Sequence, residues 1–162
     1  MSDGKTILGA NFSAGVWIEN AEGDVLLQER ARTEAEYAGL WSLPGGFQPK
    51  GVPARDVVLA RLASELGTQE VKLAREPFRK DWVSDGYGAS CSYSLFVPKQ
   101  TYELEVFQSH NMNTVPSVRF FSRLQLIAMK QEGLLHPATA YAVQELLEES
   151  DLSPLTRRSA RI

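Results

Sequence analysis

The segment from Trp41 to Gly67, WSLPGGFQPKGVPARDVVLARLASELG, constrains the fold more than any other part of the chain. Pro53 suits the first turn of a helix because its φ is already helical, and Gly67 is a natural helix stop. Between them, apolar residues recur at helical spacing and predict a buried stripe of Val58, Leu59, Leu62 and Leu66. A glycine pair ahead of this helix gives the segment the outline of a loop–helix element that handles phosphate.

Strands are predicted on both sides of the helix. Residues 12–19 and 25–28 flank a turn at 20–24, which predicts a β-hairpin, and a short strand at 40–43 is expected to stop at the following Pro-Gly-Gly. Further strands are expected at residues 71–83, 89–97, 103–107 and 118–121.

Two helices are predicted to complete the chain. Ser122 is expected to cap a helix that ends near Gly133, and Pro137 opens a last helix over residues 138–149. The order of strands, helix, strands and two helices predicts an α/β (α+β) fold, in which a largely β core is flanked by helices.

Length and composition narrow the class of protein. A chain of 162 residues is expected to form one domain over residues 1–150, with a loose tail at 151–162. The net charge of -3 gives no argument for nucleic acid or an anionic membrane as a partner. Cys91 is the only cysteine, which excludes an intrachain disulfide and a zinc site built on several thiolates. No apolar run is long enough to cross a bilayer, and MSDGKT lacks the form of a signal peptide, so a cytoplasmic protein is expected.

The glycine lead-in and the helix that ends in Glu-Leu-Gly resemble the Nudix family of MutT-like hydrolases, whose signature is G-x5-E-x7-R-E-U-x-E-E-x-G-U, with U a bulky aliphatic residue. In this register Gly46, Leu62, Glu65 and Gly67 agree, whereas Val52, Ala60, Arg61, Ser64 and Thr68 do not, so four of nine fixed positions match. VLLQER, VRFFS and the order of elements extend the resemblance over residues 10–149. The resemblance implies a mixed β-sheet core sandwiched by helices, and descent from enzymes that hydrolyse diphosphate bonds.

The family's metal-binding glutamates would fall at Arg61, Ser64 and Glu65, which share one helix face. Three carboxylates there hold Mg²⁺ or Mn²⁺, which neutralise a pyrophosphate and activate a water. This chain keeps only Glu65, and a single carboxylate is a weak metal site. We expect an i, i+4 ion pair between Arg61 and Glu65 on a solvated face, although Arg61 is also a candidate to bind a phosphate directly.

Two further signature positions have lost their charges together. The resemblance implies a glutamate at position 52 and an arginine at position 60, a pair that braces the loop against the helix, but this chain has Val52 and Ala60. Removing both partners of a buried pair is less costly than removing one. We therefore expect a degenerate box whose scaffold has been kept.

Several residues are candidates to bind a ligand without metal. Arginines suit phosphate oxygens and aromatic rings stack on bases, which favours residues near the mouth of a Nudix cleft. The predicted set is Arg30, Arg32, Trp41, Gly45, Gly46 and Arg61, with Trp41 also expected to contribute to the core. His110 is expected to be a surface residue, and His136 part of a helix entry.

Three functions remain open from the sequence. The first is a Nudix-fold protein that binds a nucleotide-like or other phosphorylated ligand with little canonical hydrolysis. The second is an atypical hydrolase of nucleoside diphosphate derivatives that uses Glu65 with acids from other loops, such as Asp56, Asp81, Asp85, Glu103 or Glu105, and Mg²⁺ or Mn²⁺. The third is an interaction protein that keeps only the fold. The resemblance also implies a possible homodimer.

Overall fold

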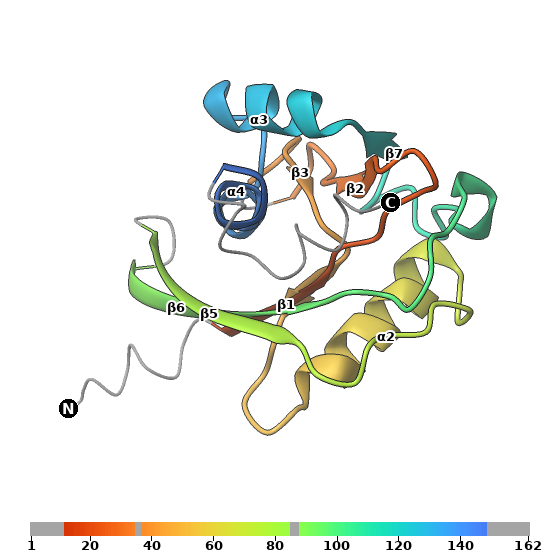
Figure 1. Ribbon diagram of the computed structural model, residues 1–162, viewed down its shortest axis with the longest axis horizontal. Helices are drawn as coiled ribbons and strands as arrows, with labels where there is room; N and C mark the ends of the chain where they lie inside the picture. Colours follow the sequence, from red (N-terminus) through yellow and green to blue (C-terminus); the bar gives the residue numbers. More distant parts are fainter. Residues whose placement is uncertain (1–11, 35–36, 85–87, 149–162) are drawn as a thin grey trace.

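The fold combines two β-sheets with helices on both sides, as expected from the resemblance (Figure 1). The computed structural model describes residues 12–34, 37–84 and 88–148. The predicted tail at 151–162 lies outside the described residues, as do the side chains of Asp81, Asp85 and Cys91.

A four-stranded sheet has the order β4-β1-β6-β5, where β1 (Phe12–Val16) pairs in parallel with β6 (Gly88–Phe96) and antiparallel with β4 (Gly45–Phe47). Strand β5 (Phe78–Ser84) completes it, so the predicted strand at 71–83 begins later than expected. A three-stranded sheet has the order β3-β2-β7, with β3 (Trp41–Ser42), β2 (Val25–Glu29) and β7 (Val118–Phe121).

The predicted hairpin of residues 12–28 is confirmed only beside its turn and is wrong for strands β1 and β2. Strands β1 and β2 belong to different sheets and meet only near the turn, through a bridge between Glu19 and Val25 and a hydrogen bond from Leu26 N to Ile18 O at 2.9 Å. The chain from β1 to β2 therefore passes from one sheet to the other. The short strand does stop at Pro-Gly-Gly, as predicted, because β3 ends at Ser42; Gly45 and Gly46 then begin β4 in the other sheet, which was not predicted.

The helix of the 41–67 segment forms as predicted. Helix α2 (Ala54–Leu66) begins after Pro53 and ends at Gly67, which adopts the left-handed conformation with φ 66°. Val58, Leu62 and Leu66 are buried, but Leu59 is 36% exposed and Val57 is buried instead. Three of the four predicted stripe residues are therefore confirmed, and Val57 takes the place of Leu59 on the face that packs on β1 and β4.

The remaining elements include one correction. Residues 103–107 form the 3-10 turn η1 (Leu104–Val106) rather than a strand. Helix α3 (Arg123–Gln131) begins with the predicted Ser122 cap, in which the hydroxyl accepts Gln125 N–H and the Gln125 side chain accepts Ser122 N–H. Helix α4 (Pro137–Val143) continues as the π-helical turn η2 (Gln144–Glu148).

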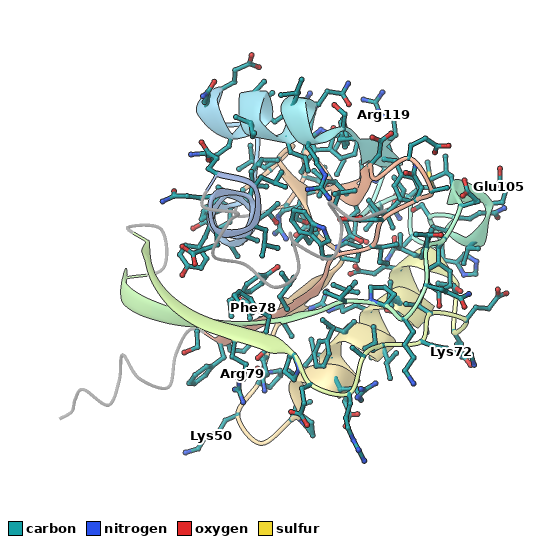
Figure 2. All side chains as sticks on the ribbon, viewed as in Figure 1. Lys50, Lys72, Phe78, Arg79, Glu105 and Arg119 are labelled. Carbon is teal, nitrogen blue, oxygen red and sulfur yellow. The ribbon has the colours of Figure 1, made fainter. Side chains whose placement is uncertain are left out.

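The two-residue period of the strands sorts the core into two clusters. On β2, Leu26 faces the cluster packed on α2, whereas Val25 and Leu27 face the cluster packed on α3 and α4. Charged side chains such as Lys72, Glu105 and Arg119 lie on the outer surface (Figure 2). Helices therefore cover the sheets on both sides. Residues from both sheets line a cavity that lies between the sheets.

Candidate ligand-binding site

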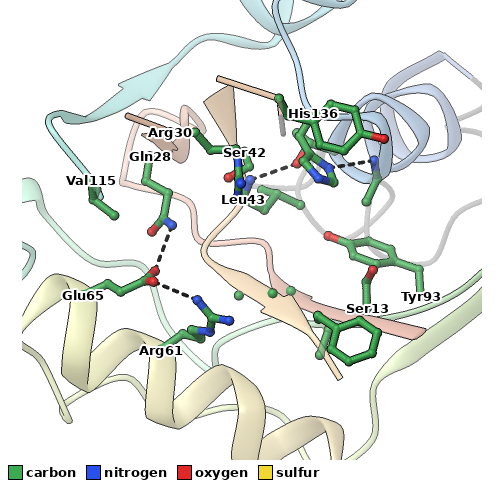
Figure 3. Close-up of a pocket in the computed structure, with 18 of the residues that line it drawn as sticks. Ser13, Gln28, Arg30, Ser42, Leu43, Arg61, Glu65, Tyr93, Val115 and His136 are labelled. Atoms are coloured by element: carbon green, nitrogen blue, oxygen red, sulfur yellow. Dashed lines mark hydrogen bonds and ion pairs between the residues drawn. The ribbon is translucent and has the colours of Figure 1, made fainter. Parts of the chain in front are cut away.

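A cavity of about 580 Å³ lies between the two sheets, in the size range of sites for small ligands. Its walls come from β1, β4, β6, the end of β2 with the loop that follows it, the end of β3 and the start of α4 (Figure 3). Helix α2 contributes two side chains. Phe12, Tyr37, Phe47 and Tyr93 supply aromatic surface. The cavity brings together residues that are far apart in the sequence.

The α2 side of the cavity holds the predicted ion pair. Arg61 Nη1 donates to Glu65 Oε2 at 2.8 Å, which confirms the i, i+4 contact. The expected solvated face is wrong for Glu65, because its side chain is 15% exposed against 43% for Arg61. On the helix surface an i, i+4 ion pair contributes only a few tenths of a kcal/mol, and here only the Arg61 end is well exposed.

A residue from β2 occupies the other carboxylate oxygen. Gln28 Nε2 donates to Glu65 Oε1 at 3.0 Å, so protein donors take both oxygens of Glu65. The side-chain oxygen Oε1 of Gln28 is buried and has no hydrogen-bond partner among the described residues, at a cost of about 1–3 kcal/mol. Reversing the amide would point that oxygen at a carboxylate, so the contact with Glu65 fixes its orientation.

Gly46 makes room for the Arg61 guanidinium. A Cβ at Gly46 would lie 3.0 Å from Arg61 Cζ and Nη2, closer than such contacts usually allow. The guanidinium therefore lies flat against the β4 backbone. One of its N–H groups is used by Glu65, which leaves other donors of this planar fork for an acceptor in the cavity.

The second arginine of the cavity is also paired with a glutamate. Arg30 Nη2 lies 3.4 Å from Glu34 Oε1, and both side chains are about one-third exposed. Glu34, in the polar loop after β2, was not among the acids singled out from the sequence. The spacing of Arg30 and Glu34 is a weak signal there, since no helix fixes their distance.

His136 lines the opposite side of the cavity from α2 (Figure 3). Its Nδ1 accepts Ala138 N–H at 3.1 Å, so it caps α4, which confirms a role in the helix entry. Burial, with a smaller effect of the nearby Arg30 guanidinium, lowers the pKa of His136 from 6.5 to about 4. A neutral imidazole that accepts at Nδ1 carries its proton on Nε2, so at neutral pH His136 is a hydrogen-bond donor rather than a base.

Acid should destabilise the protein through His136. Above about pH 6.5 the imidazole is neutral in both states, but as the pH falls toward 4 the unfolded chain binds a proton that the folded state excludes. The free energy of unfolding should therefore fall by roughly 2 kcal/mol more in the natural protein than in His136→Asn, which keeps a capping side chain. Urea unfolding at neutral pH and near pH 4 measures the difference, and equal losses in both proteins would contradict this assignment.

The cavity includes some of the predicted ligand-binding residues and leaves out others. Arg30, Gly45, Gly46, Arg61 and Glu65 line it. Arg32 and Trp41 are not among the lining residues. Arg32 lies against Gly39, and a Cβ there would be 3.7 Å from Arg32 Cγ.

Trp41 packs on the core instead, as the sequence also suggested. Its ring meets Phe121 edge to face with centroids 5.0 Å apart, and the exposed Arg119 guanidinium lies 5.4 Å from the Trp41 ring centroid. These contacts hold Trp41 beside α4 and β7 rather than at the cavity. Its neighbours Ser42 and Leu43 line the cavity in its place.

Val52 and Ala60, the positions at which the resemblance implies a bracing pair, are both exposed. Val52 is 36% exposed and Ala60 also lies at the surface. The expectation that two apolar residues repaired a buried pair is therefore wrong for this chain, because neither side chain is buried. Water would solvate a charge left at either position, so its loss carries little energetic penalty.

The residues on α2 do not fit a divalent metal site. Mg²⁺ prefers several oxygen ligands, whereas this face has one carboxylate with both oxygens engaged and a guanidinium beside it. Among the side chains that the structure describes, no three His, Cys, Asp or Glu residues are grouped to hold a metal ion.

Comparison with known proteins identifies the family. A family model described as the NUDIX domain matches residues 10–146. The chain therefore belongs to the Nudix family. Nudix hydrolases generally use divalent metal ions.

Solved structures show the same fold. A MutT NUDIX hydrolase from Burkholderia pseudomallei is 19% identical, with a TM-score of 0.58, over 83% of this chain and 95% of that one. A Nudix hydrolase from M. smegmatis is 21% identical, with a TM-score of 0.64, over 90% of this chain and 89% of that one. A MutT protein from Methanosarcina mazei Go1 is 16% identical, with a TM-score of 0.62, over 86% of this chain and 94% of that one.

No curated protein matches the chain at a significant level. Within the described part of the chain, no helix has the length and apolar character that crossing a bilayer requires.

Proposed function

We propose that this Nudix-fold protein binds a nucleotide-like or other phosphorylated ligand without a divalent metal, and has little canonical Mg²⁺-dependent hydrolase activity. The observation that carries the proposal is the occupation of Glu65, whose two carboxylate oxygens accept from Arg61 and Gln28. A lone carboxylate held in this way beside a guanidinium is a poor ligand for a divalent metal. The guanidinium of Arg61 supplies a fixed cation on the face where family members would hold metal ions.

The rest of the cavity supports a ligand of this kind. Charge-assisted hydrogen bonds from a planar guanidinium suit phosphate oxygens, and the aromatic walls suit a planar ring. His136 adds a neutral imidazole at the far side. In this proposal Arg61 holds the phosphate, with its Nη1 still anchored by Glu65.

A calorimetric titration of nucleotides in the presence of EDTA tests the binding. Arg61→Gln should weaken affinity by about 10- to 100-fold, because it removes charge-assisted hydrogen bonds to phosphate. Arg32→Gln is the matched control, since it removes an arginine that does not line the cavity, and it should leave affinity unchanged. The absence of binding by every phosphorylated compound would favour an interaction protein that keeps only the fold.

A second candidate function is an atypical hydrolase of nucleoside diphosphate derivatives. Glu34 favours it, because this acid from the loop after β2 lines the same cavity as Glu65. A hydrolysis screen of nucleoside triphosphates, dinucleoside polyphosphates and sugar nucleotides with Mg²⁺ or Mn²⁺ separates the two functions. Turnover that disappears in Glu65→Gln and in Glu34→Gln would establish the hydrolase and reject our preferred proposal.

A further inference from the structure

The charges of the cavity cancel in pairs. Among the described residues that line it, the charged side chains are two arginines and two glutamates, arranged as Arg30–Glu34 and Arg61–Glu65. The His136 side chain also lines the cavity, and it is neutral at physiological pH because its pKa is lowered to about 4. Each arginine thus already has a carboxylate partner, and these residues together contribute no net charge.

The two ion pairs lie on different sides of the cavity. Arg61 and Glu65 come from α2, whereas Arg30 lies on the side of His136, whose pKa it lowers (Figure 3). Tyr37 is also on that side, because its ring meets the His136 ring edge to face with centroids 4.6 Å apart. The α2 side of the cavity therefore presents the Arg61 guanidinium against Gly46 of β4. The opposite side combines the Arg30–Glu34 ion pair with the rings of Tyr37 and His136.

We infer that the cavity takes a ligand with a single phosphate group joined to a heteroaromatic ring, in its chemistry a nucleoside monophosphate. This inference rests on the proposed function and narrows its ligand class. The phosphate binds the Arg61 donors that Glu65 leaves unused. The ring lies toward Tyr37, where Arg30 and Glu34 offer a donor and an acceptor side by side to the edge of a base.

The cavity does not suit additional phosphates. Each one adds negative charge, and the described lining offers no cation that lacks a carboxylate partner. Glu34 and Glu65 repel a polyphosphate, and a partly enclosed site screens this repulsion less than water does. Divalent metals normally compensate the charge of a polyphosphate, but the α2 face does not fit them.

Calorimetric titrations in EDTA with a nucleoside and its mono-, di- and triphosphate test the inference, for each of the four common ribonucleosides. For the base that binds best, the monophosphate should bind at least about tenfold more tightly than the nucleoside. The diphosphate should bind no more tightly than the monophosphate, and the triphosphate more weakly. Affinity that rises about tenfold with each added phosphate would overturn the inference but leave the proposed function standing. A lack of binding by all the phosphorylated compounds would reject both.

The Glu34→Gln variant tests the charge argument in a protein whose folding is checked by its binding of the monophosphate. Glu34→Gln removes one carboxylate and leaves the Arg30 charge uncompensated, so the preference for diphosphate over monophosphate should increase by about tenfold. Glu105→Gln removes an exposed carboxylate outside the cavity and should not change this ratio. An unchanged ratio in Glu34→Gln, in a protein that still binds the monophosphate, would contradict the charge argument.

Discussion

Gly45→Ala should lower the free energy of unfolding by about 4 kcal/mol, the largest loss that we expect from a single methyl group in this chain. Gly45 has φ 137°, which side-chain-bearing residues rarely adopt, and a Cβ there would lie 2.1 Å from Ala14 O. The clash is with backbone, which cannot rotate away. Because Gly45 pairs with Gly15 in the β1–β4 ladder, relief of the clash would separate the two strands.

Gly51→Ala is the matched control for this loss. Gly51 also has a positive φ, of 85°, but a Cβ there would meet nothing within 4 Å. Its substitution should cost only the backbone strain, about 1 kcal/mol. Urea unfolding followed by tryptophan fluorescence compares the two variants with the natural protein, and similar losses in both would show that the contact with Ala14 is unimportant.

The double variant Arg61→Glu, Ser64→Glu should gain a divalent metal site. With Glu65 it places three carboxylates at i, i+3 and i+4 on α2, and it removes the guanidinium that now occupies Glu65 Oε2. We expect Mn²⁺ to bind at least about tenfold more tightly than to the natural protein. Calorimetry or the loss of the free Mn²⁺ signal in electron paramagnetic resonance measures the gain.

Single variants show which residue blocks the metal. Ser64→Glu alone keeps Arg61 on Glu65, so it should bind Mn²⁺ little better than the natural protein. Circular dichroism checks that helix α2 survives the added negative charges. If the folded double variant binds Mn²⁺ no better than Ser64→Glu, the Arg61 contact is not what prevents metal binding.

Helix α2 shows what could be predicted from the sequence. Its start after Pro53, its stop at Gly67 and the ion pair between Arg61 and Glu65 depend on residues at most four positions apart, or on a single residue's backbone preference. The Ser122 cap of α3 is local in the same way. Such features survive any tertiary arrangement, which is why they were predicted correctly.

The hairpin and the glycine pair show where local patterns mislead. A turn between two β-forming segments favours pairing, but β1 pairs with β6, about 80 positions away, and β2 with β7. Gly45 and Gly46 do end the short strand β3, but the small size of these residues also lets β4 pack against β1 and against Arg61. In both cases a long-range contact decided a pairing that the local pattern did not indicate.

The sequence by itself indicated the Nudix framework and the ion pair on α2, and it places Arg61, Ser64 and Glu65 together on one face of that helix. Only the tertiary structure decided that Glu65 is also held by Gln28, that Glu34 and His136 line the same cavity, and that Arg32 and Trp41 do not. The reason is physical: spacing along a helix fixes which of its own side chains meet, whereas the distance between β2, α2 and α4 depends on how the sheets pack. The charge balance of the cavity, on which the choice of ligand depends, belongs to this second kind of information.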